Sequence, residues 1–300
     1  MHLIEKYDGG SWKIDSMLGA GFSGKVYKIS KIGSNPPIQE ALKVFSLPEI
    51  RQIIKNSHPE FDSAQLDRCA DLQLDSAREK ILAFQEADSP YILSYHHFEV
   101  VETDEDPGPH FFLRMELLQS LELAYALNHS SEKDVCRLGV DICSALELYA
   151  KNGLVHGNIK PSEIFLAQNG GYKLGGFEHS HPADAKPANA GIVGARYYTA
   201  PEVEKGLNSG NSDLYSLGMV MHQLLNNGRM PFVSQGKSAK PGETIEARFK
   251  RLKGDALPPP VNASPALAAI VLKACAFDGE KRYQSTTEMK NALLGINSFR

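Results

Sequence analysis

The hydrophobic pattern of this chain changes its period near residue 118, and this change constrains the fold more than any other sequence feature. Before that point, segments such as "WKIDSMLGAGFSGKVYKISKI" and "HFFLRMELL" alternate apolar and polar residues, as strands with one buried face do. After it, "EKDVCRLGVDICSALELYAKNG" and "SDLYSLGMVMHQLLNNG" space their apolar residues three and four apart, as amphipathic helices do. We therefore expect an α+β protein with a small β-rich part followed by a larger helical part.

The β-rich part contains one helical stretch between its third and fourth expected strands. Residues 50–87 carry apolar side chains at helical spacing, and the break at "SHPEFD" divides them into a short helix and a longer one. We expect residues 1–118 to form a first lobe with an insert at about 48–76, and residues 119–300 to form a second lobe. The two lobes would make one domain, with a cleft between them and a hinge near Met115–Leu118.

Composition excludes several classes of protein. A net charge of −4 argues against a nucleic-acid partner, because neutralising phosphates requires a basic surface. No apolar run approaches the ~18 residues of a membrane span, so we expect none within this chain. The cysteines are widely spaced and form no metal-binding pair, which predicts reduced thiols and a cytoplasmic location; they are Cys69, Cys136, Cys143 and Cys275.

Two motifs in the first lobe suggest phosphate binding. "LGAGFSGKVY" matches the pattern G-x-G-x-x-G-x-V, in which glycines let a hairpin bring backbone amides close to phosphate oxygens; the matching residues are Gly19, Gly21, Gly24 and Val26. About twenty residues further, "EALKVF" places Ala41 and Lys43 in an apolar strand. Each motif is weak alone, because glycine-rich hairpins are common and a strand lysine can simply extend to solvent.

Five further motifs follow in order: "HGNIKPSEIF", "YKLGGFEHS", "YYTAPEV", "NSDLYSLGMVM" and "DGEKRYQS". Together with the first two, they resemble the sequence elements of eukaryotic-like (Hanks-type) Ser/Thr protein kinases, from Trp12 to about Leu294. The C-terminal segment is most similar to bacterial members of that family. The resemblance implies the bilobal protein-kinase fold, with a β-rich N-lobe carrying one main helix and a larger helical C-lobe.

The resemblance also assigns roles to individual residues. The glycine loop and Lys43 would contact the phosphates of ATP, and Lys160 would contact the γ-phosphate. Further nucleotide contacts would come from Val26, Ala41, Met115, Glu116 and Leu118. His156, Glu202, Asp213 and Arg282 would support the C-lobe, with Asp213 bracing the loop "HGNIKPSEIF" and Arg282 pairing with Glu202. Glu79 would pair with Lys43, although an ungapped count back from Pro90 selects Lys80 in its place.

Three positions that supply the catalytic base and the metal ligands in kinases depart from the kinase pattern here. Asn158 stands at the catalytic aspartate, Glu163 at the metal-binding asparagine, and Gly176 at the aspartate of the D-F-G element. An amide cannot accept a proton at neutral pH, and glycine has no ligand atom. These departures favour a pseudokinase, that is, a kinase-like domain that is not an enzyme and acts as a scaffold or allosteric regulator. Its partner would be a protein, such as an active kinase or a signalling complex.

Other interpretations remain open at this point. The pseudokinase could bind ATP without a metal. Alternatively, the chain is a weak or atypical Ser/Thr kinase, or a nucleotide-dependent transferase, in which Glu163 and Glu178 bind Mg²⁺. In a third interpretation the cleft is filled by residues 50–76, or by Phe22 and Phe177, and binds no nucleotide.

Overall fold

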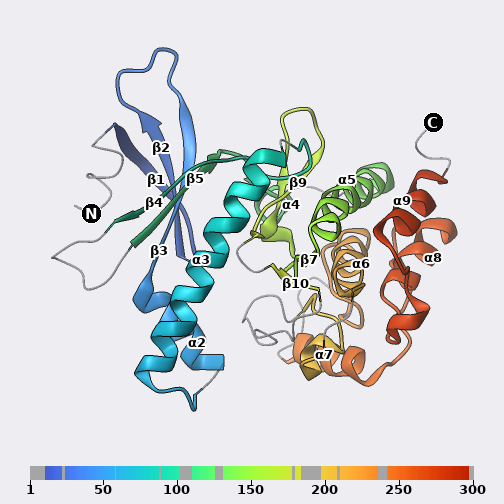
Figure 1. Cartoon of the computed structure of the whole chain (residues 1–300). Helices are drawn as coiled ribbons and strands as arrows, with labels where there is room; N and C mark the ends of the chain where they lie inside the picture. The colour runs from blue at the N-terminus through green and yellow to red at the C-terminus, as the bar shows by residue number, and fades with distance from the viewer. Residues whose placement is uncertain are drawn as a thin grey trace. The chain divides into compact units, whose positions relative to one another are not determined.

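The chain divides into two compact units, Met1–Leu118 and Gln119–Arg300. The structure is a computed structural model, and it describes residues 11–21, 24–57, 59–87, 89–101, 110–125, 131–177, 180–183, 197–207, 210–235 and 242–296. Within the described residues, the first unit consists of a sheet with two helices and the second is mainly helical, so the expected α+β architecture is confirmed (Figure 1).

A five-stranded antiparallel sheet forms the first unit, with strand order β1-β2-β3-β5-β4. Its strands are β1 (Trp12–Gly21), β2 (Gly24–Lys31), β3 (Gln39–Ser46), β4 (Tyr95–Val101) and β5 (His110–Glu116). Successive side chains of a strand point to opposite faces. One face therefore carries a core of Trp12, Ile29, Leu42 and Phe112, and the Arg114 guanidinium lies 4.5 Å from the centre of the Trp12 ring.

The opposite face of the sheet is covered by α2 (Leu47–Ser57) and α3 (Ser63–Ala87). Ile50 and Ile54 of α2 form a second core with Ala70 of α3 and Phe111 of β5. An ion pair between Arg51 and Asp67 joins the two helices. Figure 1 shows α3 running beside the sheet. The helical stretch expected in this region therefore packs as a helical hairpin with its own apolar contacts.

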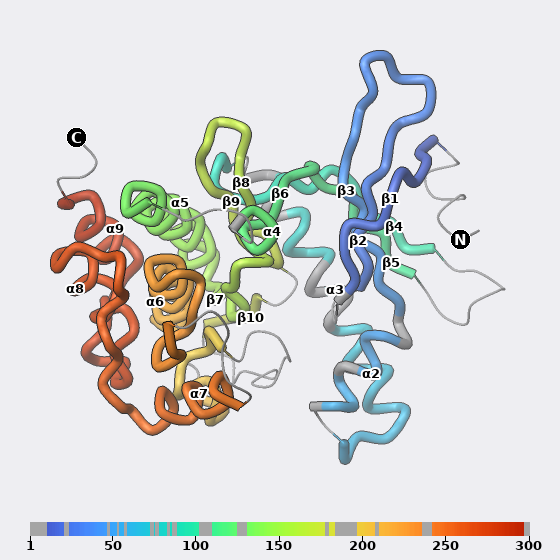
Figure 2. Tube along the Cα trace, turned by 180° about the vertical axis from the view of Figure 1, so that it is seen from behind, coloured from blue at the N-terminus to red at the C-terminus, as the bar shows by residue number. Residues whose placement is uncertain are grey.

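The second unit is built around α6 (Ser212–Leu225), which is buried along most of its length because nearly all its residues are apolar or small. It contacts α5 (Glu132–Lys151) and α8 (Pro265–Ala274), and α5 also contacts α9 (Thr286–Leu294). Figures 1 and 2 both show α5 beside α6. The remaining helices of the described chain are α4 (Leu121–Tyr125) and α7 (Glu243–Lys253), with short 3₁₀ turns at Pro161–Glu163, Val203–Lys205 and Gly279–Lys281. Among the described helices, none is long and apolar enough to cross a membrane.

Two small sheets position the loops of the second unit. One has the order β6-β8-β9 and the other pairs β7 with β10; these strands are β6 (Gln119–Ser120), β7 (Leu154–Val155), β8 (Ile164–Leu166), β9 (Tyr172–Leu174) and β10 (His181–Pro182). In the β8–β9 register Ile164 lies opposite Leu174, and the Gly175 amide donates to the Glu163 carbonyl at 2.8 Å. The loop before β8 therefore lies directly against the segment that follows β9.

Candidate active site

The loop between β7 and β8, residues 156–163, is held by one carboxylate of α6. Asp213 is buried, and its Oδ2 accepts a hydrogen bond from the His156 amide at 2.7 Å while its Oδ1 accepts one from the Gly157 amide at 2.8 Å. Hydrogen bonds to a charged acceptor are stronger than neutral ones. The sequence placed Asp213 beside this loop, and the structure brings the two together.

His156 connects this loop to the segment after β9. Its side chain is fully buried. Nε2 lies 2.7 Å from the Gly175 carbonyl oxygen, and Nδ1 lies 3.2 Å from the backbone nitrogen of Asn158. Because a carbonyl only accepts, Nε2 carries the proton and Nδ1 accepts from Asn158. The Tyr149 ring packs against the imidazole at 5.1 Å. The backbone of both segments is therefore fixed by internal contacts.

Glu163 fills the space that a side chain at position 176 would enter. Gly176 has φ +73°, and a Cβ built on it would lie 2.5 Å from Oε2 and 2.7 Å from Cδ of Glu163. Real Cβ contacts are longer than this, so a residue with a side chain at 176 would require the Glu163 side chain to move. The Glu163 carboxylate, from the facing loop, therefore lies in the space next to Gly176 that a side chain at the D-F-G position would enter.

Lys160 forms an ion pair with this carboxylate. Its Nζ lies 3.7 Å from Glu163 Oε1, and both side chains are mostly buried. Glu163 itself ends the 3₁₀ turn Pro161–Glu163. The loop therefore presents one negative and one positive charge side by side, in surroundings that screen them less than water does.

The Asn158 side chain is buried without a hydrogen-bond partner. The residue is 1% exposed, and neither its Oδ1 nor its Nδ2 is bonded within the described part of the chain. Most buried side-chain amides are bonded, and leaving one unsatisfied costs about 1–3 kcal/mol. The sequence identified Asn158 as a departure from the kinase pattern, but it gave no sign of this unsatisfied state.

Arg282 binds Glu202 through two parallel hydrogen bonds. Nη1 donates to Oε1 at 2.6 Å and Nη2 donates to Oε2 at 2.7 Å, and the arginine is 1% exposed. Nε donates to the Ala276 carbonyl at 2.8 Å, and the guanidinium lies 4.8 Å from the centre of the Tyr215 ring. This pair ties the segment around Glu202 to the helical core.

Comparison with protein families decides which group this arrangement belongs to. The family described as "Protein kinase domain" matches residues 12–294. This chain belongs to the protein kinase family.

Three relatives show which kinases the chain resembles. It is 25% identical to "Serine/threonine-protein kinase PknB" of Mycolicibacterium smegmatis over 219 residues, covering 69% of this chain and 33% of the relative. It is 34% identical to "Serine/threonine-protein kinase Pkn1" of Myxococcus xanthus over 207 residues, covering 65% of this chain and 28% of the relative. It is 32% identical to "Probable serine/threonine-protein kinase SCO3848" of Streptomyces coelicolor over 159 residues, covering 50% and 22%. The chain therefore spans a third or less of the length of these relatives.

These relatives correct one prediction. The sequence favoured a domain that is not an enzyme, whereas the similar proteins are named Ser/Thr-protein kinases and point to an enzyme. The prediction judged Asn158, Glu163 and Gly176 separately, by comparing each with the residue expected at its position. In the folded kinase domain, the Glu163 carboxylate occupies the space that a side chain at Gly176 would enter, so these two positions have to be judged together.

Kinases of this family normally bind ATP together with Mg²⁺. The described residues contain no group of three or more His, Cys, Asp or Glu side chains arranged around a common point. Mg²⁺ is commonly held by one or two carboxylates, with phosphate oxygens and water completing the octahedron. Glu163 could serve as the carboxylate ligand of one cation whose other ligands would be nucleotide phosphate oxygens and water. Glu178, the second carboxylate proposed from the sequence, lies outside the described residues.

In the kinase N-lobe, the motifs predicted to bind phosphate lie on neighbouring strands. Lys43 of β3 is 8% exposed and is the register partner of Val26 on β2 and Leu113 on β5. Gly24 has φ +107°, and a Cβ there would lie 2.3 Å from the Val44 carbonyl oxygen, so only glycine fits. The other predicted residues of this set are Gly19 and Gly21 on β1, Ala41 on β3, Met115 and Glu116 on β5, and Leu118 just after it. Phe22 lies outside the described residues.

The expected partner of Lys43 lies on α3. Glu79 is exposed and Lys80 is half-buried, whereas Lys43 is buried. The pairing of Lys43 with Glu79 therefore stays a prediction. At the predicted hinge, the Glu116 carboxylate accepts a hydrogen bond from the Ser94 amide at 2.7 Å, and the Glu116 amide donates to the Ser94 carbonyl at 3.0 Å. The start of the hinge is thereby fastened to the loop before β4.

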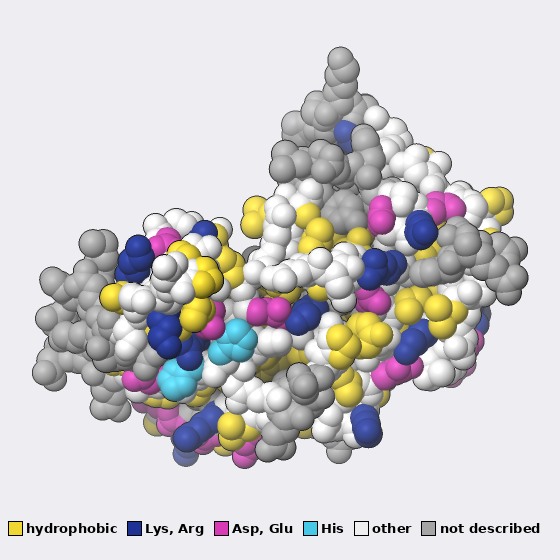
Figure 3. All heavy atoms as spheres, turned by 90° about the horizontal axis from the view of Figure 1, so that it is seen from above, with side chains coloured by type: hydrophobic (Ala, Val, Ile, Leu, Met, Phe, Trp, Pro, Cys, Tyr) yellow, Lys and Arg dark blue, Asp and Glu magenta, His cyan; other side chains and the backbone are white. Residues whose placement is uncertain are grey.

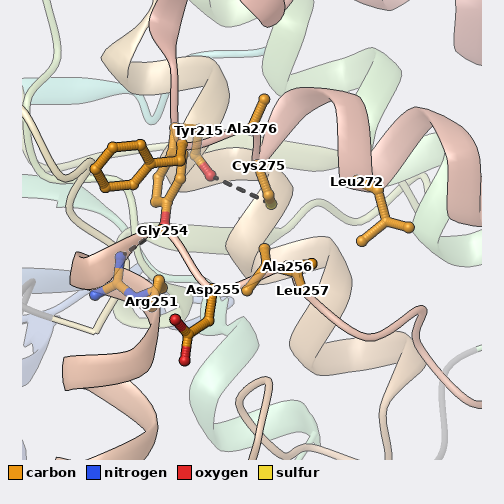
Figure 4. Close-up of a pocket in the computed structure, with 10 residues that line it drawn as sticks. Tyr215, Arg251, Gly254, Asp255, Ala256, Leu257, Leu272, Cys275 and Ala276 are labelled. Carbon is orange, nitrogen blue, oxygen red and sulfur yellow. Dashed lines mark hydrogen bonds between the residues drawn. The ribbon is translucent and has the colours of Figure 1, made fainter.

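A separate cavity of about 180 Å³ lies in the C-lobe, between α6, the end of α7 and α8 (Figure 4). In the close-up, the Arg251 guanidinium points to the Tyr215 hydroxyl, at 3.0 Å, and the Cys275 thiol points to the Tyr215 carbonyl. Arg251 also donates to the Thr199 carbonyl at 2.6 Å. Burial raises the pKa of Cys275 to about 12, so this thiol is not a nucleophile at neutral pH. Of the kinase motifs, only "NSDLYSLGMVM" reaches this cavity, through Tyr215.

The charges on the surface are mixed in sign. On the face shown in Figure 3, Lys and Arg side chains are interspersed with Asp and Glu. The exclusion of a nucleic-acid partner stays a prediction based on net charge.

Proposed function

We propose that this chain is an atypical Ser/Thr protein kinase that transfers the γ-phosphoryl group of ATP to a protein hydroxyl with the help of one divalent cation. A single observation supports this proposal. The Glu163 carboxylate occupies the place that the absent side chain at Gly176 would take, so a carboxylate is present near the position where kinases hold their metal.

Charge is the main requirement of phosphoryl transfer, because the enzyme contributes mostly positioning and electrostatic stabilisation. When bound, Mg²⁺ supplies positive charge to the phosphate oxygens. Glu163 would hold this cation, and Lys160, whose Nζ is 3.7 Å from Glu163 Oε1, would add a second positive group on the same side. The usual Asp, Asn and Asp of a kinase give two carboxylates, whereas Asn158, Glu163 and Gly176 give one. We therefore expect one cation rather than two, bound more weakly.

The N-lobe supplies the nucleotide site in this proposal. Gly24 keeps the hairpin tight, and Lys43, a buried cation on the central β3 strand, would contact the α- and β-phosphates. The adenine would lie against Val26, Ala41 and Met115, next to the hinge residues Glu116 and Leu118. A protein bearing Ser or Thr side chains would be the partner. A cytoplasmic location fits this proposal, because ATP is abundant there and the described cysteines are all free.

The test is a phosphotransfer assay with radiolabelled ATP and myelin basic protein, run with Mg²⁺, Mn²⁺ or EDTA. We expect label transfer with either cation and none with EDTA. Glu163→Gln keeps the side-chain size and removes the charge, so the rate should fall at least tenfold. Glu280→Gln, the same change at an exposed acidic residue, should leave the rate unchanged. Absence of transfer by the folded wild-type protein under every condition would contradict the proposal.

Calorimetric titration with ATP separates binding from chemistry. Binding with Mg²⁺ that weakens in EDTA, and weakens in Glu163→Gln, is the expected result. Equal affinity with and without the cation would mean that ATP binds independently of metal, and it would remove Glu163 from the proposed role.

A further inference from the structure

The unsatisfied amide of Asn158 is the polar group of the catalytic loop that the fold itself does not explain. The loop backbone is already held by Asp213 and by the imidazole of His156, whose Nδ1 accepts a hydrogen bond from the backbone NH of Asn158. The side chain, in contrast, has a buried carbonyl and a buried NH₂ group with no partner in the described chain. Such a pair of groups is complementary to a ligand that both donates and accepts a hydrogen bond.

We infer that Asn158 positions the acceptor hydroxyl of the substrate protein and takes no proton from it; this inference rests on the proposed function. Oδ1 accepts the hydrogen bond of the hydroxyl, and Nδ2 donates to an oxygen of the phosphoryl group in transfer. An aspartate at this position could make the first contact but would repel the second, because both would be negatively charged. The amide therefore suits a site whose negative charge comes from Glu163 and the nucleotide alone. At 1% exposure, Asn158 is reached by a substrate only when the groups that cover it move.

The reaction balances without a protein base. A lone pair of the acceptor oxygen forms the new O–P bond, and the bond from phosphorus to the bridging oxygen breaks, leaving its electrons on ADP. The proton of the hydroxyl passes to an oxygen of the transferred phosphoryl group and from there to solvent. General-base assistance commonly contributes about 10²–10⁴-fold, so this enzyme should be slow by comparison with other kinases.

The first test compares the pH dependence of kcat in the wild type, Asn158→Ala and Asn158→Asp, with Asn291→Ala, a change at an exposed asparagine of α9, as the control. Because an amide does not ionise near neutral pH, the pH profile of the wild-type kcat should contain no ionisation that comes from residue 158. Asn158→Ala should lower kcat at least tenfold with an unchanged KM for ATP. Asn158→Asp should add an ionisation, with kcat rising as the new carboxylate deprotonates. Wild-type kcat and KM in Asn158→Ala would overturn the inference.

The second test needs no activity, so it separates a failure of this inference from a failure of the proposed function. If the side-chain amide serves only to bind the substrate, removing it should not lower the thermal stability of the free protein. The Tm of Asn158→Ala should then equal or exceed that of the wild type. A Tm lowered by more than about 4 °C, equivalent to roughly 1–2 kcal/mol in a domain of this size, would show that the amide is a structural group and would overturn the inference.

Discussion

The backbone of the catalytic loop and the side chains that the loop presents differ sharply in how they are bonded. The backbone amides of His156 and Gly157 both bind Asp213, and the imidazole of His156 reaches the next segment. The side chain of Asn158 has no partner in the described chain, and the Glu163 carboxylate lies 3.7 Å from the Lys160 ammonium. The chain has therefore kept the loop framework of a kinase, while the residues differ at positions that carry the chemistry in other kinases.

Breaking the framework should have the largest effect. Arg282→Ala would leave Glu202 next to the core without its two hydrogen bonds, and losing one partner of a buried pair costs about 3–5 kcal/mol. Urea denaturation should show this loss. Arg282→Lys keeps the charge but only part of the geometry, so it should recover a fraction of the stability. A change below 1 kcal/mol in Arg282→Ala would mean that the framework does not depend on this pair.

Positions 163 and 176 can be tested as one unit. Gly176→Asp alone introduces a Cβ into the space of the Glu163 carboxylate at φ +73°, which should cost about 2–4 kcal/mol from overpacking and backbone strain. Adding Glu163→Asn should recover much of that loss, because the shorter side chain vacates the space. A double-mutant cycle measures the coupling, which we expect to exceed about 1 kcal/mol. Additive effects would show that the two positions do not share a volume.

The same double variant sharpens the comparison of charges. It restores the asparagine and aspartate that other kinases use. In the presence of ADP, the double variant should therefore bind two Mn²⁺ ions per protein, where the wild type should bind one. Electron paramagnetic resonance of Mn²⁺ measures this number directly. Two bound ions in the wild type would contradict the single-cation proposal.

A milder change to the framework should have a moderate effect. Asp213→Asn keeps one acceptor oxygen, so one of the two amide hydrogen bonds to His156 and Gly157 is lost. We expect a loss of about 1–3 kcal/mol in urea denaturation. An unchanged stability would show that water replaces the lost acceptor at no cost.

The smallest effect concerns pH. Burial lowers the pKa of His222, whose Nε2 lies 2.9 Å from the Pro258 carbonyl. A group with a lowered pKa in the folded state binds its proton more readily when unfolded, so stability should fall as the pH drops below the ordinary value near 6.5. Thermal unfolding between pH 7.5 and pH 5 should show this decline, and His222→Gln should reduce it. An equal decline in His222→Gln would assign it to other groups.

Much of the fold was predictable from the sequence. The change of hydrophobic period separates the sheet from the helices, because each element has to bury one face at its own spacing. The motif order also placed Asp213 beside the catalytic loop and Arg282 beside Glu202, and both contacts are present. These contacts follow from fixed residue types at fixed places in one fold.

The candidate site was predictable only in part. The identities at positions 158, 163 and 176 were readable, but their meaning depended on volume and hydrogen bonding, which the sequence does not display. When each position is read alone, Glu163 and Gly176 are two departures from the kinase pattern. In the structure, the Glu163 carboxylate lies where a side chain at 176 would lie. The lack of a partner for Asn158 depends on every group around it, and no local pattern encodes that.

The labelling rates of the buried cysteines of the C-lobe report how often its core becomes transiently exposed to solvent. Burial raises the pKa of both Cys143 and Cys275 to about 12, so neither presents a thiolate to a labelling reagent while the lobe is closed. Cys69 in the N-lobe is half-buried and lies on α3, so it should be labelled in the folded protein. The rate at which maleimide then modifies the remaining thiols reports how often the C-lobe core exposes itself, and a mass spectrum taken over time would record it without any engineered probe.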